Sequence, residues 1–293
     1  MAAQTKVHVS QIKTYQTCPR MYYFNYVLKL VPKVENSKLL FGRGIHLGLA
    51  EYYSTGQLSA ALTTYNTWLD EQRLLLMGSA ADPDHLAEAS RLGEVLLKEY
   101  IAFAGAHDDF EPVAVEQDFE VPIWTPKGRQ SRMMHRGRID LIVRDRYGKL
   151  WLGEHKTAKD APVELSLQLD FQASAYMVAA TQLFGQQITG VVYNVIRKVD
   201  PAKARTPVII RKLVVRTAHE LLATATQMYQ WARRMLTDKE FSPISGRHCS
   251  WQCAYSSLCL CMQDGTDYRL LADALYETRK EVIEDASDDN IPT

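Results

Sequence analysis

The chain has 293 residues, of which 46% are hydrophobic and 23% are charged, a balance typical of a soluble globular protein. This length can bury a sizeable core, either as one large domain or as one domain with appendages. No apolar stretch approaches the roughly 20 residues of a membrane span, and the N-terminus lacks the apolar segment of a signal peptide. We therefore expect a cytoplasmic protein with no membrane partner.

The formal net charge is zero, but charged residues are distributed unevenly along the chain. Residues 1–50 contain seven Lys or Arg and one acidic residue, and the segment from Lys127 to Arg138 adds five basic residues and no acid. The stretch from Glu281 to Asp289 is acidic. Such a distribution is compatible with an anionic ligand on one face. A solvated surface without a ligand would have the same pattern.

Two helices are predicted near the N-terminus. Ser10 is a candidate N-cap for the first helix, which Pro19 interrupts. The second helix follows Phe41–His46, where two glycines allow another part of the chain to approach closely. A lone histidine in such a place is more often structural, but the neighbouring glycines favour a role for His46 in a site.

A helical block and a strand come next. Residues 58–105 carry apolar side chains at three-to-four spacing, with breaks near Gly78 and at Asp82–Pro83, which predicts a helical insertion. The segment from Val113 to Ile123 alternates apolar and polar residues, as a strand does. A basic loop from Lys127 to His135 is expected to join this strand to the next one.

The most informative stretch is a predicted hairpin with strands Gly137–Val143 and Trp151–Thr157. A three-residue loop fits between them, with Gly148 in the left-handed conformation that such loops need. This loop pairs Asp145 with Lys149 and so determines the register of the two strands.

Counting back five residues on each strand places Asp140 opposite Glu154. The Cβ atoms of directly opposed residues are roughly 4.5–5.5 Å apart, and like charges at that distance are destabilising. Lys156 shares a strand face with Glu154, whereas His155 points to the other face. Two facing carboxylates therefore predict a divalent metal site with a lysine at its edge.

The second half of the chain alternates helices and strands. A helix is predicted over Ser166–Phe184, in which Gln168, Gln172 and Tyr176 form one polar stripe. A capping box at Thr217 opens a later helix. The remaining predicted elements are strands at residues 190–197 and 207–217, a helix ending near 238 and a last helix from about 268. This order predicts a mixed α/β fold.

Four of the five cysteines lie close together near the C-terminus, whereas Cys18 stands alone. Buried apolar thiols usually scatter along a chain, and a disulfide framework is not expected in a cytosolic protein of this size. Clustered cysteines in an intracellular chain favour a metal ion or an iron–sulfur cluster. Zinc would also accept four thiolates, although zinc modules tend to bring their ligands in two local pairs.

Taken together, these motifs resemble the PD-(D/E)XK nucleases, in particular their RecB-like and CRISPR-associated exonuclease branch. The likeness is carried by Asp140 (motif II), Glu154-His155-Lys156 (motif III), Gln172 with Tyr176 (the Gln-xxx-Tyr motif) and Gly42–His46 (the Gly-xxx-His motif). Each motif alone is weak, but their order along the chain is specific. The likeness extends from Ser10 to Cys261 and includes phage-encoded members.

The cysteines resemble the split four-cysteine staple of AddB-type and CRISPR-associated nucleases. This likeness implies a [4Fe–4S] cluster held by Cys18, Cys249, Cys253 and Cys259. Three residues separate Cys249 from Cys253, where many relatives have two. Cys259 is preferred to Cys261 as the last ligand because of its match, and zinc remains the alternative to the cluster.

The resemblance implies a restriction-endonuclease-like α/β core, in which a mixed central sheet is flanked by helices. It also implies a helical insertion and a C-terminal iron–sulfur staple. We accordingly divide the chain into an N-terminal segment (1–45), a helical insertion (46–110), a nuclease core (111–240) and a cysteine segment with a last helix and an acidic tail (241–293).

The implied activity is metal-dependent DNA exonuclease activity on DNA ends or single strands, in recombination, repair or replication. DNA is the expected partner, together with recombination or replication proteins in a bacterial or phage-infected cell. The alternative is a catalytically silent iron–sulfur protein that binds DNA or serves as a scaffold. Intact acidic residues argue against this alternative, because buried carboxylates are costly to keep without a metal.

The resemblance also assigns roles to residues. Asp140 and Glu154 offer hard oxygen ligands that suit Mg²⁺ or Mn²⁺, with His46 and the backbone carbonyl of His155 as further ligands. Lys156 would orient the attacking water or neutralise charge in the transition state. Gln172 and Tyr176 would position water or phosphate, or would serve only in packing. DNA phosphates would be contacted by Arg43, Arg136 and Arg138.

Overall fold

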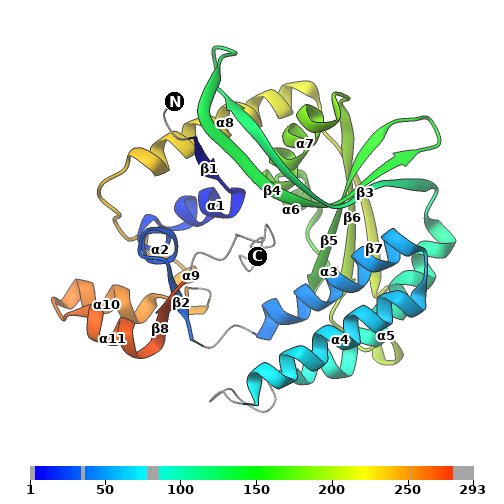
Figure 1. Ribbon diagram of the computed structural model, residues 1–293, viewed down its shortest axis with the longest axis horizontal. Helices are drawn as coiled ribbons and strands as arrows, with labels where there is room; N and C mark the ends of the chain where they lie inside the picture. The colour runs from blue at the N-terminus through cyan, green and yellow to red at the C-terminus, as the bar shows by residue number, and fades with distance from the viewer. Residues whose placement is uncertain (1–3, 34–36, 78–85, 252, 280–293) are drawn as a thin grey trace. The chain divides into compact units, whose positions relative to one another are not determined.

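The computed structural model in Figure 1 describes residues 4–33, 37–77, 86–251 and 253–279. The chain forms two compact units. The first unit comprises residues 1–35, 120–137 and 223–293, and the second unit comprises residues 36–119 and 138–222. The four-part division predicted from the sequence stays a prediction.

The structure contains helices and strands in a mixed order, as predicted. The α-helices are α1 (Val9–Thr17), α2 (Pro19–Tyr22), α3 (Ser37–Thr55), α4 (Leu58–Leu76), α5 (Ala87–His107), α6 (Glu164–Gln168), α7 (Phe171–Phe184), α8 (Ala218–Thr237), α9 (His248–Trp251), α10 (Ser256–Asp264) and α11 (Tyr268–Leu275). The strands are β1 (Thr5–Val7), β2 (Leu30–Pro32), β3 (Phe110–Trp124), β4 (Gln130–Asp145), β5 (Leu150–Ala158), β6 (Ile188–Arg197), β7 (Ile209–Val215) and β8 (Tyr276–Thr278). No helix in the described ranges is both long and apolar enough to cross a membrane.

The sheet of the second unit is mixed. Strands β4 and β5 pair antiparallel, β5 and β6 parallel, and β6 and β7 antiparallel. The predicted hairpin register is confirmed, because Leu141 pairs with Gly153 and the N–H of Asp145 donates to the carbonyl of Lys149 at 3.0 Å. Gly148 has a φ of +78°, the left-handed value that the loop requires.

Helix α3 contacts β5 and α5 contacts β7, while α4 packs on both of these helices (Figure 1); α7 packs on β5 and β6. The sequence predicted a close approach at Gly42 and Gly44; in the structure Thr157 of β5 lies near Gly42, and helix α4 lies near Gly44. A Cβ atom on Gly44 would lie 2.3 Å from the ring of Trp68, and one on Gly48 would lie 2.7 Å from Leu97. The glycines thus let α4 and α5 pack closely against the helix that carries His46.

The first unit joins early and late parts of the chain. Strand β1 pairs parallel with the start of β4, and β2 pairs antiparallel with β8, Leu30 opposite Thr278. Helices α2, α10 and α11 share one small core that includes Phe24, Leu258 and Tyr276. The Tyr15 hydroxyl donates to Asp238 at 2.5 Å.

Two predictions about element boundaries are wrong, one near the N-terminus and one before β4. The first helix starts at Val9, not after Ser10. Its N-cap is His8, whose backbone N–H donates to the side chain of Gln11 at 2.9 Å. The predicted basic loop over residues 127–135 is mostly strand, because a short turn at 125–129 already closes the β3–β4 hairpin and β4 begins at Gln130.

The helix predicted over residues 166–184 is two helices, α6 and α7. Asp170 divides them, since its carboxylate caps α7 by accepting the N–H groups of Gln172 and Ala173. Gln168 therefore lies outside the helix that carries Gln172 and Tyr176. The capping box at Thr217 is confirmed by its reciprocal hydrogen bonds with Glu220. The breaks predicted near Gly78 and at Asp82–Pro83 lie outside the described residues.

Candidate active site and cysteine pocket

Three side chains with metal-binding groups converge in the second unit: His46 on α3, Glu116 on β3 and Asp140 on β4. Each offers one ligand atom, and these atoms all lie within 4.8 Å of one another. Nδ1 of His46 is 3.5 Å from Oδ1 of Asp140. One imidazole and two carboxylates form a donor set that suits Mn²⁺ or Mg²⁺. The motifs pointed to His46 and Asp140 but did not reveal Glu116.

Glu116 has an unusual backbone, with a φ of +46° in the middle of a strand. This left-handed conformation strains a residue with a Cβ atom by about 1–3 kcal/mol, and such strain tends to occur at functional sites. Regular alternation would give Glu116 the same direction as Asp118 and Glu120, which are exposed. The local distortion leaves Glu116 half-buried instead, and no periodicity in the sequence signals it.

The three groups shift one another's pKa values. Burial would lower the pKa of His46, but Asp140 and then the other carboxylates more than offset it and raise that pKa to about 9. Burial would raise the pKa of Asp140, but His46 and the His155 backbone lower it to about 2. Burial and the Asp140 charge raise the pKa of Glu116 to about 7. A divalent cation here would have to displace protons from His46 and Glu116.

Metal affinity is therefore expected to increase with pH. Mn²⁺ should bind more tightly as the pH rises through about 7 and towards 9, because Glu116 and His46 lose their protons in that range. Mn²⁺ titrations followed by electron paramagnetic resonance at several pH values would measure this increase in affinity. An affinity that does not change with pH would contradict the prediction.

The same two groups affect the stability of the metal-free protein. The pKa values of Glu116 and His46 lie above their ordinary values of 4.5 and 6.5, so the free energy of unfolding should fall between pH 4.5 and 9.

Glu154 and Lys156 form an ion pair on β5. Nζ of Lys156 is 3.3 Å from Oε1 of Glu154 and 3.0 Å from Oδ2 of Asp170, the residue that caps α7. Burial would lower the pKa of Lys156, but the two carboxylates more than offset it and raise that pKa. Glu154 is not in the group of mutually close ligand atoms found among the described residues. Asp170 is a second site residue that the motifs did not reveal, although its N-cap position is readable from the sequence.

His155 contributes to the site through its backbone. Its N–H donates to Oδ2 of Asp140 at 2.9 Å, while its side chain is buried on the opposite face, stacked on Tyr53, as the alternation of the strand predicts. Gln172 and Tyr176 are buried on α7, where the ring of Tyr176 contacts Phe119 edge-on at 5.4 Å.

The three arginines expected to contact DNA lie in different surroundings. Arg43 is half-buried on α3. Arg138 binds Asp118 through two hydrogen bonds, of 2.8 and 3.1 Å. Arg136 belongs to the first unit. Arg138 is thus paired with a carboxylate.

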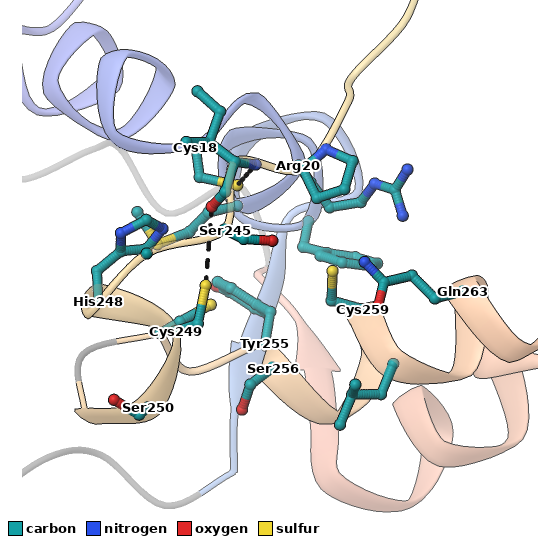
Figure 2. Close-up of a pocket in the computed structure, with 17 residues that line it drawn as sticks. Cys18, Arg20, Ser245, His248, Cys249, Ser250, Tyr255, Ser256, Cys259 and Gln263 are labelled. Atoms are coloured by element: carbon teal, nitrogen blue, oxygen red, sulfur yellow. Dashed lines mark hydrogen bonds between the residues drawn. The ribbon is translucent and has the colours of Figure 1, made fainter.

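A second site lies in the first unit, where cysteines surround a cavity of about 320 Å³ (Figure 2). The cysteines that line it are Cys18, Cys249, Cys253 and Cys259, whereas Cys261 is not among the lining residues. The N–H of Ile244 donates to the sulfur of Cys18 at 3.4 Å, and the thiol of Cys249 donates to the carbonyl of Ile244 at 3.7 Å. These are the four cysteines that the staple resemblance selected.

The chemistry of this pocket fits a positively charged group. Burial raises the pKa values of the Cys253 and Cys259 thiols, and the neighbouring sulfurs of Cys18 and Cys249 raise them further. The four thiols line one cavity, and as thiolates they would repel one another unless a cation lay between them. An iron–sulfur cluster and a zinc ion both satisfy this requirement.

The α/β fold with a candidate divalent-metal centre at its sheet defines the class of this protein. Residues 6–260 match the PD-(D/E)XK nuclease superfamily. The chain belongs to that superfamily, and its mixed sheet flanked by helices is the predicted restriction-endonuclease-like fold.

Known proteins with a similar fold are distant in sequence. A provisionally named exonuclease from Eubacterium rectale is 11% identical, with a TM-score of 0.51 over 82% of this chain and 84% of that chain. The crystal structure of SSO0001 is 16% identical, with a TM-score of 0.41 over 88% of this chain and 87% of that chain. A search of the curated proteins found no match. At 11% identity, the similarity to the Eubacterium rectale protein concerns the fold alone.

Proposed function

We propose that this protein is a metal-dependent exonuclease that hydrolyses phosphodiester bonds at DNA ends or in single strands, in recombination, repair or replication. The observation that supports this most strongly is the convergence of His46, Glu116 and Asp140. The Glu154–Lys156 pair lies on the adjacent strand β5, directly after Gly153, which pairs with Leu141 of β4.

Mg²⁺ or Mn²⁺ would be held by His46, Glu116 and Asp140. Glu154 and the backbone carbonyl of His155 would be further oxygen donors. When bound, the cation would supply Lewis-acid activation of the water and charge neutralisation at the phosphate. The donor set fits this role because two of its three groups are carboxylates, which hard cations prefer.

Lys156 has a role that its surroundings define. Because its pKa is raised, it remains an ammonium at neutral pH and does not act as a general base. It can instead donate hydrogen bonds to the attacking water or to a phosphate oxygen, where negative charge develops in the transition state. Glu154 and Asp170 hold it in place, and Gln172 and Tyr176 would position the water, Lys156 or a phosphate.

We further propose that the four pocket cysteines hold a [4Fe–4S] cluster, with zinc as the alternative. Cys18 comes from the end of α1, and the other three come from the C-terminal region. A cluster at this point would therefore join the N-terminal and C-terminal segments of the first unit.

Phosphate contacts would come from Arg43, Arg136 and Arg138. DNA affinity should then fall as salt increases, because phosphate-bound counterions are released on binding. Arg138 would have to exchange its pairing with Asp118 for a phosphate.

The test is product analysis with end-labelled linear DNA, single-stranded and double-stranded, beside a closed circle, each with Mg²⁺, Mn²⁺ or EDTA. The wild type should degrade linear DNA only with metal and leave the circle intact, and Lys156→Met should be strongly impaired. Cleavage of the circle would contradict the exonuclease assignment. A wild type that binds DNA without cleaving any substrate would support the catalytically silent alternative.

A further inference from the structure

A row of polar side chains crosses the sheet of the second unit. His155 on β5 is opposite Asn194 on β6, and Asn194 is opposite Arg211 on β7. Nε of Arg211 donates to Oδ1 of Asn194 at 2.7 Å. Opposed residues share a sheet face. The row therefore lies on the face away from Glu154 and Lys156.

Helices α3 and α5 connect the far end of this row back to His155. Nη1 of Arg211 is 2.6 Å from Oδ1 of Asp108, and Oδ2 of Asp108 accepts the hydroxyl of Tyr53 at 3.0 Å. The hydroxyls of Tyr53 and Tyr100 share a 2.8 Å hydrogen bond. Both rings contact the His155 imidazole, that of Tyr53 stacked at 5.7 Å and that of Tyr100 edge-on at 5.6 Å.

His155 links this network to the metal-binding groups. Its backbone N–H donates to Asp140 at 2.9 Å, and its ring meets that of His46 edge-on at 6.1 Å. His46 and Tyr53 are both on α3, seven residues apart, and therefore share one helix face. The network thus contacts two of the three converging ligands: Asp140 through the His155 backbone, and His46 through the His155 ring.

A packing role alone does not explain these polar groups. Tyr53, Tyr100 and His155 are each at most 9% exposed, and apolar side chains would fill the same space without the cost of burying hydroxyls. Burial raises the pKa values of both tyrosines, so their hydroxyls keep their protons and remain directional donors. Hydrogen bonds in a low-dielectric interior restrict the groups that form them to one orientation, here the hydroxyls of Tyr53 and Tyr100 and the carboxylate of Asp108.

We propose that Tyr53, Tyr100, Asp108 and Arg211 are positioning residues that orient His155 and His46 at the metal centre. This inference rests on the proposed function, because it requires His46 and Asp140 to bind a divalent cation. Residues that hydrogen-bond directly to metal ligands typically contribute about 10–100-fold to metal affinity. This network reaches the ligands through ring contacts and the His155 backbone, so we expect an effect at the lower end of that range.

The test compares Tyr53→Phe with a matched control, Tyr65→Phe. Tyr65 is also buried, and its hydroxyl donates to the carbonyl of Ala89 at 2.8 Å, far along the chain from the ligands. Tyr53→Phe loses two hydrogen bonds, with Tyr100 and Asp108, and Tyr65→Phe loses one, so both variants are destabilised and their affinities are compared only where each is folded. The Kd for Mn²⁺, measured by electron paramagnetic resonance well below the melting temperature, should rise about tenfold in Tyr53→Phe and stay unchanged in Tyr65→Phe. Asp108→Asn, as a second variant, should also weaken binding.

Each outcome decides the inference. Wild-type affinity in both Tyr53→Phe and Asp108→Asn would overturn it and leave the proposed function intact. Equal weakening by Tyr65→Phe would also overturn it, because the effect would then be general destabilisation. A wild type that binds no Mn²⁺ would overturn both the inference and the metal-dependent function.

Discussion

Asp140→Asn is expected to abolish metal-dependent DNA cleavage, with a loss of about 10³-fold or more. Asp140 is the residue on which the centre converges, since it lies beside His46 and Glu116 and accepts the His155 N–H. A bound metal stabilises the transition state by several kcal/mol, and roughly 1.4 kcal/mol corresponds to a tenfold change in rate. Asparagine keeps the shape and one acceptor oxygen but removes the charge, so the fold should persist while metal binding is lost.

Initial rates on end-labelled linear DNA, with Mn²⁺ and with Mg²⁺, would measure this loss. Asp160→Asn is a suitable control, because it removes the same charge from an exposed position between β5 and α6. Circular dichroism would show whether both variants fold. Unchanged cleavage by a folded Asp140→Asn would contradict the assignment of this centre.

Cys18→Ser is expected to lose the iron–sulfur cluster and to destabilise the first unit. Cys18 is the one cysteine of the pocket that comes from the N-terminal region. Without it the cluster would no longer join the two parts of the unit. Binding free energy of a structural metal is folding free energy. A loss of several kcal/mol corresponds to a decrease in Tm on the order of 10 °C for a protein of this size.

The chain offers a matched control in Cys261→Ser, because Cys261 belongs to the same helix as Cys259 but does not line the cavity. Protein purified without oxygen should contain iron and absorb visible light in the wild type and in Cys261→Ser, but not in Cys18→Ser. Equal iron loss in both variants would contradict the choice of ligands. A colourless wild type with stoichiometric zinc would refute the cluster and support the zinc alternative.

Local features were predictable because neighbouring residues determine them. The register of the β4–β5 hairpin follows from loop length and from the left-handed conformation of Gly148, both readable from adjacent residues. That register led to the prediction that Asp140 faces Glu154, so the predicted metal site began from a local rule. In the structure, Asp140 lies beside His46 and Glu116, and its carboxylate accepts the His155 N–H. The restriction-endonuclease-like fold followed from the order of the motifs, since each motif marks a known element of the fold.

Only the tertiary structure revealed Glu116, Asp170 and the network behind His155. Glu116 reaches the centre through a strained backbone that periodicity does not encode, and it meets His46, 70 positions earlier in the chain, only after β3 and α3 have packed. The side of α10 that faces the cavity adds a second reason, besides the motif match, to prefer Cys259 to Cys261. The sequence by itself determined the hairpin, the motifs and the cysteine set, because short-range geometry specifies them. Packing decided which distant side chains meet, because such contacts depend on how whole helices and strands bury their apolar faces.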